Sequence, residues 1–71
     1  MPNYIVNRNP QPNGDHEVHD EASIYGCLPL PENRAALGNY TYCNGAVSAA
    51  LTLGFSRANG CAWCASPCHT S

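Results

Sequence analysis

The sequence predicts a small α+β domain with a three-stranded antiparallel sheet, one helix on its face, and a C-terminal clamp rich in cysteine and histidine. Three observations lead to this fold class. An Asn-Gly pair separates two strand-like segments, a later segment has amphipathic helical spacing, and residues 60–71 hold three of the five cysteines. We expect a single domain, residues 1–71, in which the cysteines supply stability that so short a chain cannot gain from apolar burial alone.

Residues 4–21 predict a β-hairpin. Strand-forming side chains lie on both sides of Asn13-Gly14, a dipeptide typical of the two-residue type I′ turn, in which both central residues have positive φ. Residues 22–37 are interrupted by glycine and proline, so we expect a loop there.

Residues 39–43 predict the third strand, because aromatic and β-branched side chains alternate there. Asn44 is a suitable N-cap for a helix over residues 45–53, and Gly54 has the residue type that commonly ends a helix. The cysteine-rich tail follows at residues 60–71.

Composition and charge exclude several classes of function. The 71 residues carry a net charge of −2, with no lysine and scattered arginines, which excludes a nucleic-acid-binding surface. No segment has the length of apolar sequence that a membrane span needs. The N-terminus has neither the basic nor the apolar region of a signal peptide, so we expect a cytoplasmic protein, where clustered cysteines hold metal more often than disulfides.

The tail contains the strongest chemical motif, a Cys61-x-x-Cys64 pair that can place two thiolates on one ion from a single turn. Zinc takes four such ligands, so we expect Cys68 as the third, with its neighbour His69 in reserve. The fourth must come from upstream, from either Cys43 or Cys27. The sequence therefore predicts a zinc site whose candidate ligands are Cys61, Cys64, Cys68, Cys43, His69 and Cys27.

Two other states of the cysteines stay open, one or two disulfides or free thiols. The odd cysteine count disfavours a fully paired disulfide set. The spacing fits neither the usual haem attachment motif nor the common ferredoxin runs, and the chain is too short for a thioredoxin fold.

The histidines of the predicted return strand form a second polar group. His16 and His19 point to opposite faces of a strand, so they do not converge on one ion by themselves. We interpret this segment as half-exposed, with Val18 inward and the charges outward. It stays open that one histidine orients the turn or joins the metal site.

The chain resembles a family of small uncharacterised bacterial proteins. The resemblance covers nearly the whole sequence and rests on Tyr4-Ile5-Val6-Asn7, Asn13-Gly14-Asp15-His16-Glu17-Val18-His19, Leu30-Pro31-Glu32-Asn33-Arg34, Leu37-Gly38, Cys43, and a Gly-Cys-x-x-Cys-x-x-x-Cys-His-Thr tail over residues 60–70. It implies that Cys27, Cys43, Cys61, Cys64, Cys68 and His69 belong to one framework, and it implies no activity.

For function, we expect a small metal- or disulfide-stapled module that binds another protein and catalyses nothing. The reason is that the titratable groups fall either on a solvent-facing strand or in a cysteine cluster saturated by its own bonds. The alternative is a redox or metal-handling protein that uses the same thiols, and a secreted disulfide-rich polypeptide is a third possibility.

Overall fold

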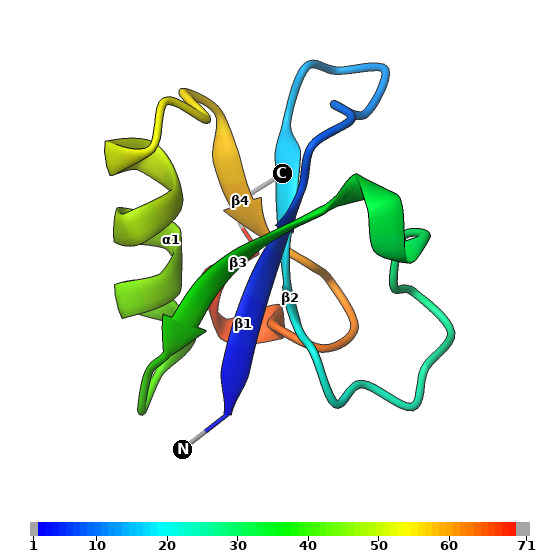
Figure 1. Cartoon of the computed structure of the whole chain (residues 1–71), viewed down its shortest axis with the longest axis vertical. Coiled ribbons are helices and arrows are strands. Elements are labelled where there is room, and N and C mark those ends of the chain that lie inside the picture. The colour runs from blue at the N-terminus through cyan, green and yellow to red at the C-terminus, as the bar shows by residue number, and fades with distance from the viewer. Residues whose placement is uncertain (1, 70–71) are drawn as a thin grey trace.

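A computed structural model, which describes residues 2–69, shows a four-stranded mixed sheet with one α-helix packed on one face (Figure 1). The sheet has the strand order β3-β1-β2-β4. The elements are β1 (Asn3–Asn7), β2 (His16–Asp20), the 3-10 helix η1 (Pro31–Asn33), β3 (Arg34–Asn39), α1 (Cys43–Thr52), β4 (Ala58–Gly60) and the 3-10 helix η2 (Ser66–Cys68). The α+β class is confirmed. The predicted three antiparallel strands correspond in number and direction to β3, β1 and β2, but the prediction misses β4, which makes the sheet four-stranded and mixed.

The predicted hairpin is present as β1 and β2, which pair antiparallel with Val6 opposite Val18. Its turn differs from the predicted type I′. Only Gly14 has positive φ there, at 90°, and its N–H donates to the carbonyl of Gln11 at 2.8 Å. This hydrogen bond makes Gln11 the first residue of the turn and Pro12 the second. The fixed negative φ of proline suits that position and excludes a type I′ turn, which needs a positive φ there.

The third strand lies earlier than predicted. β3 occupies Arg34–Asn39, within and just after the expected loop of residues 22–37, and residues 40–42 are not in a strand. The position of β3 is set by its antiparallel pairing with β1. One edge of β1 is hydrogen-bonded to β2, and the other edge is free to pair with β3. The register shifts between Tyr4 and Ile5, so β3 carries an irregularity that alternation alone does not reveal.

β4 is the strand that makes the sheet mixed. Its three residues pair in parallel with β2, with His16 opposite Ala58 and Val18 opposite Gly60. The sequence Ala-Asn-Gly has low strand propensity. The strand therefore forms because these residues can pair with the free edge of β2. The pairing carries the chain from the end of α1 back beside β2.

α1 begins two residues earlier than predicted, at Cys43, and Tyr42 rather than Asn44 is at its N-cap. It ends at Thr52, one residue before the predicted end, and Gly54 follows the C-cap Leu53 with a φ of 101°, the left-handed conformation that closes many helices. Within the first turn, a Cβ on Gly45 would lie 2.7 Å from the ring of Tyr40. The helix can approach the segment before it because this position is glycine.

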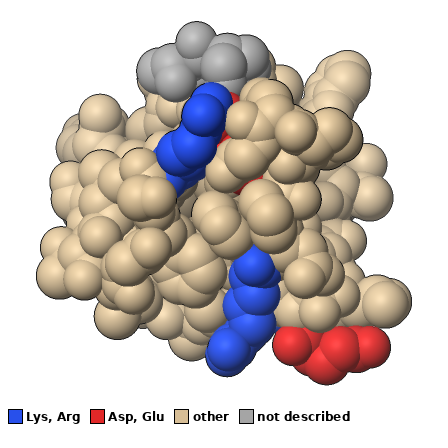
Figure 2. All heavy atoms as spheres, turned by 90° about the horizontal axis from the view of Figure 1, so that it is seen from above, with Lys and Arg blue, Asp and Glu red and all other residues tan. Residues whose placement is uncertain are grey.

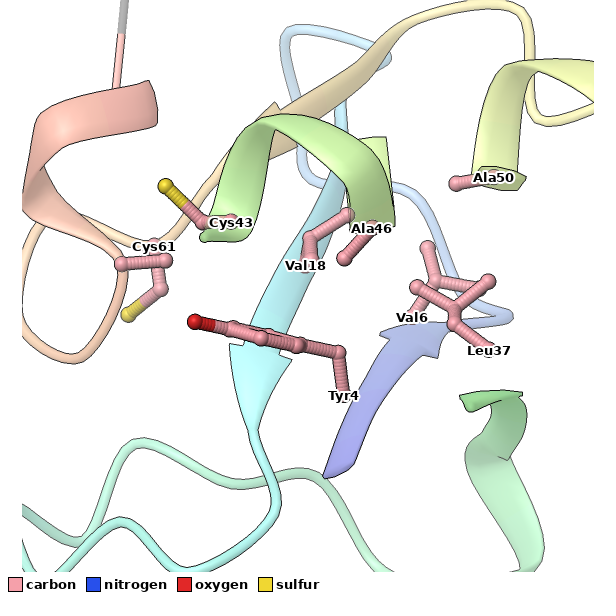
Figure 3. Close-up of a cluster of buried hydrophobic side chains, with 9 residues drawn as sticks. Tyr4, Val6, Val18, Leu37, Cys43, Ala46, Ala50 and Cys61 are labelled. Atoms are coloured by element: carbon pink, nitrogen blue, oxygen red, sulfur yellow. The ribbon is translucent and has the colours of Figure 1, made fainter. Parts of the chain in front are cut away.

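The two faces of the sheet are covered differently. Val6 and Val18 face Ala46 and Ala50 of α1 and form the centre of the hydrophobic core, which Tyr4 extends toward the cysteines (Figure 3). Strand alternation turns Ile5 and His19 to the opposite face. They are nonetheless buried, and the long segment from β2 to β3 runs along that side of the sheet (Figure 1).

A polar network closes the sheet at the start of β2. The buried carboxylate of Asp15 accepts hydrogen bonds from Arg57 at 2.9 Å and from the Asn59 amide at 3.2 Å. The Asn13 side chain also donates a hydrogen bond to the Asp15 carboxylate at 3.3 Å and accepts one from the Asp15 backbone N–H at 3.0 Å.

On the face shown in Figure 2 the basic side chains lie apart from one another and form no continuous patch. In the described part of the chain, no helix is long and apolar enough to cross a membrane.

Candidate metal centre

Four potential metal ligands converge beside the end of β2. They are His19 in β2, Cys27 in the loop that follows, and Cys61 and Cys64 in the turn after β4. Their ligand atoms all lie within 4.8 Å of one another. The sulfur of Cys64 is 3.4 Å from that of Cys27 and 3.5 Å from Nδ1 of His19. A tetrahedral zinc site with Zn–S bonds of about 2.3 Å has ligand–ligand separations of roughly 3.8 Å, so small adjustments would fit these atoms around one ion.

β4 places the Cys61-x-x-Cys64 turn. The backbone N–H of Cys61 donates to the carbonyl of Val18 at 2.9 Å, which continues the β2–β4 pairing up to the first thiol. The carbonyl of Cys61 accepts from the N–H of Ala65 at 3.0 Å, and the N–H of Trp63 lies 3.5 Å from the Cys61 sulfur. Backbone hydrogen bonds thus hold Cys61 in place and close the turn that carries Cys64.

Gly60 lets this turn fold back on the strand. A Cβ at Gly60 would lie 2.5 Å from the carbonyl oxygen of Ala65 and 2.6 Å from Cβ of Cys68. Neither atom belongs to the free end of a flexible side chain, so any larger residue would push the turn away from β4. The close approach that brings Cys64 toward His19 depends on glycine here.

Cys27 joins the cluster from the loop that follows β2. Its thiol lies 3.3 Å from the hydroxyl of Ser23, within the loop that leaves β2. Farther along the same loop, the carbonyl of Pro29 accepts a hydrogen bond of 2.8 Å from Nε of Arg34. The first residue of β3 therefore anchors the loop that carries this ligand.

His19 is fully buried, and its two ring nitrogens have different environments. Nδ1 faces the Cys64 sulfur. Nε2 is the one buried side-chain nitrogen or oxygen within residues 2–69 that lacks a hydrogen-bond partner. Burial, with a smaller effect from the positive charge of Arg34, lowers the pKa of His19. The ring is therefore held neutral, the form that binds metal.

The thiols differ in acidity although they are in contact. Burial raises the pKa of Cys64 to about 12, and hydrogen bonds with Cys27 and Cys61 add to the rise. Burial also raises the pKa of Cys27, but hydrogen bonds from Ser23, Cys64 and Cys61 outweigh it and bring the pKa below the ordinary value. A divalent cation would stabilise thiolates on all three cysteines.

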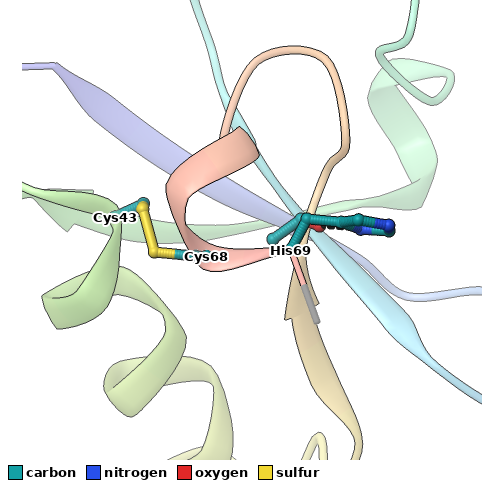
Figure 4. Close-up of a disulfide and its surroundings, with 4 residues drawn as sticks. Cys43, Cys68 and His69 are labelled. Atoms are coloured by element: carbon teal, nitrogen blue, oxygen red, sulfur yellow. Dashed lines mark hydrogen bonds between the residues drawn. A yellow bond between two sulfur atoms is a disulfide. The ribbon is translucent and has the colours of Figure 1, made fainter. Parts of the chain in front are cut away.

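The structure divides the ligands that the sequence predicts into two groups. Cys27, Cys61 and Cys64 lie together in the cluster. Cys43 and Cys68, both predicted as ligands, instead form a disulfide that joins the start of α1 to η2, so neither offers a thiolate and these assignments are corrected (Figure 4). His69 is not among the clustered ligands, and its Nδ1 lies 3.0 Å from the carbonyl oxygen of Gly60 (Figure 4).

His19 is the ligand that the predicted set lacks. The strand pattern shows that it points away from Val18, but it does not show that a cysteine-bearing loop covers that face. His16, on the helix side, has its Nδ1 2.9 Å from the carbonyl of Asn7 and its ring against Phe55. Of the two histidines, one holds the hairpin and the other joins the thiols.

One side of the cluster is near the surface. His19 and Cys61 are buried, whereas Cys27 and Cys64 are half-buried. Cys64 also lines a hollow of about 210 Å³, together with Tyr4, Thr41, Tyr42, Cys43, Asn44, Ala65 and Pro67. An ion would therefore enter from the side of Cys27 and Cys64.

Comparisons with models of protein families, with curated proteins and with solved structures found no match.

Proposed function

We propose that this protein is a small zinc-stabilised, non-enzymatic module, with the ion held by His19, Cys27, Cys61 and Cys64. The observation that carries the proposal is the convergence of these four ligand atoms within 4.8 Å of one another, from three separate segments. Three thiolates and one imidazole form a donor set typical of structural zinc sites, and harder metals prefer oxygen ligands. The ion would tie β2, the loop after it and the tail together, which supplies folding free energy that the small core lacks.

A structural role follows from the number of ligands. A catalytic zinc keeps one coordination position open for water or substrate, whereas four protein ligands fill the tetrahedron. Two of the four side chains, His19 and Cys61, are also buried. The expected site is therefore closed, and its chemistry is to hold the fold.

Elemental analysis of the purified protein tests the metal. We expect one zinc per chain, loss of zinc in the Cys27→Ser variant, and unfolding on treatment with a strong chelator. The matched control is a Cys43→Ser/Cys68→Ser double variant, which lacks two sulfurs outside the cluster but should keep one zinc. A protein that folds without metal, with Cys27 and Cys64 joined by a disulfide in the mass spectrum, would overturn the proposal.

Cobalt substitution separates a closed site from an open one. The visible absorption of a tetrahedral Co²⁺ site with thiolate ligands should not shift when azide is added, because no coordination position is free. A saturable spectral shift would show an open position and contradict the non-enzymatic assignment. Release of the metal to a weak chelator within seconds would instead favour the metal-handling alternative.

We propose another protein as the partner. What supports this is the exposure of two large aromatic side chains at the cysteine end, Tyr42 at 73% and Trp63 at 70%. Exposed aromatic residues of this kind are enriched in protein interfaces. A photo-crosslinking residue in place of Trp63 should trap a protein, whereas the same residue at Ile24, which is 91% exposed, should not. Equal capture at both positions, or none, would contradict this assignment.

We keep the cytoplasm as the proposed compartment, and the Cys43–Cys68 disulfide gives its test. Cytosolic reductants keep most protein thiols reduced, so in cells we expect this bond to be open, unlike in the structure, and both cysteines to react with an alkylating agent added at the moment of lysis. Full protection of Cys43 and Cys68 from that reagent would place the protein in an oxidising compartment instead.

A further inference from the structure

We infer that Glu17 is a positioning residue of the metal centre: its carboxylate accepts a hydrogen bond from Nε2–H of His19 and so directs Nδ1 of the same ring to the ion. This inference rests on the proposed zinc site. It adds a residue that does not touch the metal, and it specifies which nitrogen of His19 is the ligand.

The placement of the two side chains follows from β2. Glu17 and His19 are two residues apart in one strand, so both project from the sheet face opposite α1. Oε1 of Glu17 lies 3.7 Å from Nε2 of His19, and the Glu17 side chain is 21% exposed. Nδ1 of the same ring points the other way, to the sulfur of Cys64 at 3.5 Å. The imidazole thus lies between a carboxylate and the thiol cluster.

The unpartnered nitrogen is the second observation. A buried polar group without a hydrogen bond is costly, and Nε2 of His19 is such a group. When Nδ1 binds a cation, the single proton of the neutral ring must be on Nε2, so this atom becomes a donor. A shift of less than 1 Å in the Glu17 side chain would bring its oxygen to the usual distance of about 2.9 Å.

The consequence for the metal is a better ligand. A carboxylate behind a coordinated histidine fixes the orientation and tautomer of the ring and raises the basicity of the ligating nitrogen. Loss of such a partner typically weakens metal binding by about 10–100-fold. Glu17 therefore contributes to zinc affinity without contacting the ion.

The experiment is a zinc competition titration against a chromophoric chelator, carried out on the full chain and three variants. Glu17→Leu removes the acceptor at similar size, and we expect zinc affinity to fall about 10–100-fold. Glu17→Gln keeps an acceptor oxygen, so its loss should be under about tenfold. Glu21→Leu removes the same charge from an exposed position nearby and should leave the affinity unchanged.

Nuclear magnetic resonance of the wild-type protein gives a second readout that needs no variant to fold. In protein loaded with cadmium-113, coupling from the metal should appear at Nδ1 of His19, and Nε2 should carry a slowly exchanging proton. Coupling at Nε2, or an affinity in Glu17→Leu equal to that of Glu21→Leu, would overturn the inference. In those cases wild-type protein still binds zinc, which distinguishes failure of this inference from failure of the proposed site.

Discussion

The two ends of β2 are buried in different ways. At its start, the carboxylate of Asp15 is surrounded by donors from Asn13, Arg57 and Asn59, so the chain itself provides partners for the buried group. Near its end, His19 lies against three thiols, and its Nε2 has no hydrogen-bond partner. Protein hydrogen bonds stabilise the buried group at one end, whereas at the other end the proposed cation would do so. The comparison supports a role for the proposed ion at the end of the strand that carries His19.

Loss of one ligand should have the largest effect, and only at the metal end. Structural zinc sites contribute on the order of 10 kcal/mol to folding. We expect the Cys61→Ser variant to bind no zinc and to be unfolded at room temperature by circular dichroism, as chelator-treated wild-type protein should be. If this variant folds with a melting temperature near that of the wild type, the two ends do not differ as described.

At the metal end, the contribution of the Cys43–Cys68 disulfide to stability can be separated from that of the proposed ion. Cys43 and Cys68 are 25 residues apart, and a cross-link over such a loop stabilises a fold by about 3–4 kcal/mol. The Cys43→Ser/Cys68→Ser protein should lose about that free energy of unfolding in urea denaturation while it retains one zinc. Loss of zinc in this folded variant would show that the disulfide and the cluster form a single unit.

The polar end should respond to the loss of the Asp15 charge. Asp15→Asn removes a charged acceptor from a buried network, at a cost of about 1.5–3 kcal/mol in the free energy of unfolding. Zinc affinity should not change, because the hydrogen bonds described above for Asp15 go to Asn13, Arg57 and Asn59 and not to a proposed ligand. Glu32→Gln, at an exposed position, is the control and should have little effect. A weaker zinc affinity in Asp15→Asn would show that the two ends are coupled.

The smallest expected effect is at the turn beside Asp15. Gly14 has φ of 90°, and a Cβ there would meet Arg57 only at an ordinary contact distance of 3.5 Å. The cost of Gly14→Val is therefore backbone strain, about 1–2 kcal/mol by thermal denaturation. Gly14→Asn should cost less, since asparagine tolerates positive φ. Equal melting temperatures for the two variants would contradict this reason.

The sequence predicts the parts of the fold that depend on local signals. Alternation beside Asn13-Gly14 places the hairpin, and Gly54 marks the end of the helix. β4 was not predictable in this way, because three residues of low strand propensity become a strand only through pairing with β2. β3 begins earlier than the sequence predicts because antiparallel pairing with β1 determines its position.

The same distinction applies to the metal centre. Cys61 and Cys64 can be paired from their spacing, because one turn brings both sulfurs together. The choice between Cys27 and Cys43 as partner depends on which loop covers which face of the sheet, and spacing does not contain that information. His19 is recognisable only when its strand face and the loop of Cys27 are known together.

The distribution of the four ligands along the chain has a consequence for the order of folding. Cys61 and Cys64 belong to one turn, whereas Cys64 is 37 residues from Cys27 and 45 from His19. Closing long loops costs more chain entropy and slows folding. A zinc ion taken up first by the local pair would then act as a docking point that shortens the search for the two distant ligands. The rate of refolding should therefore depend on whether zinc is present before the sheet has formed.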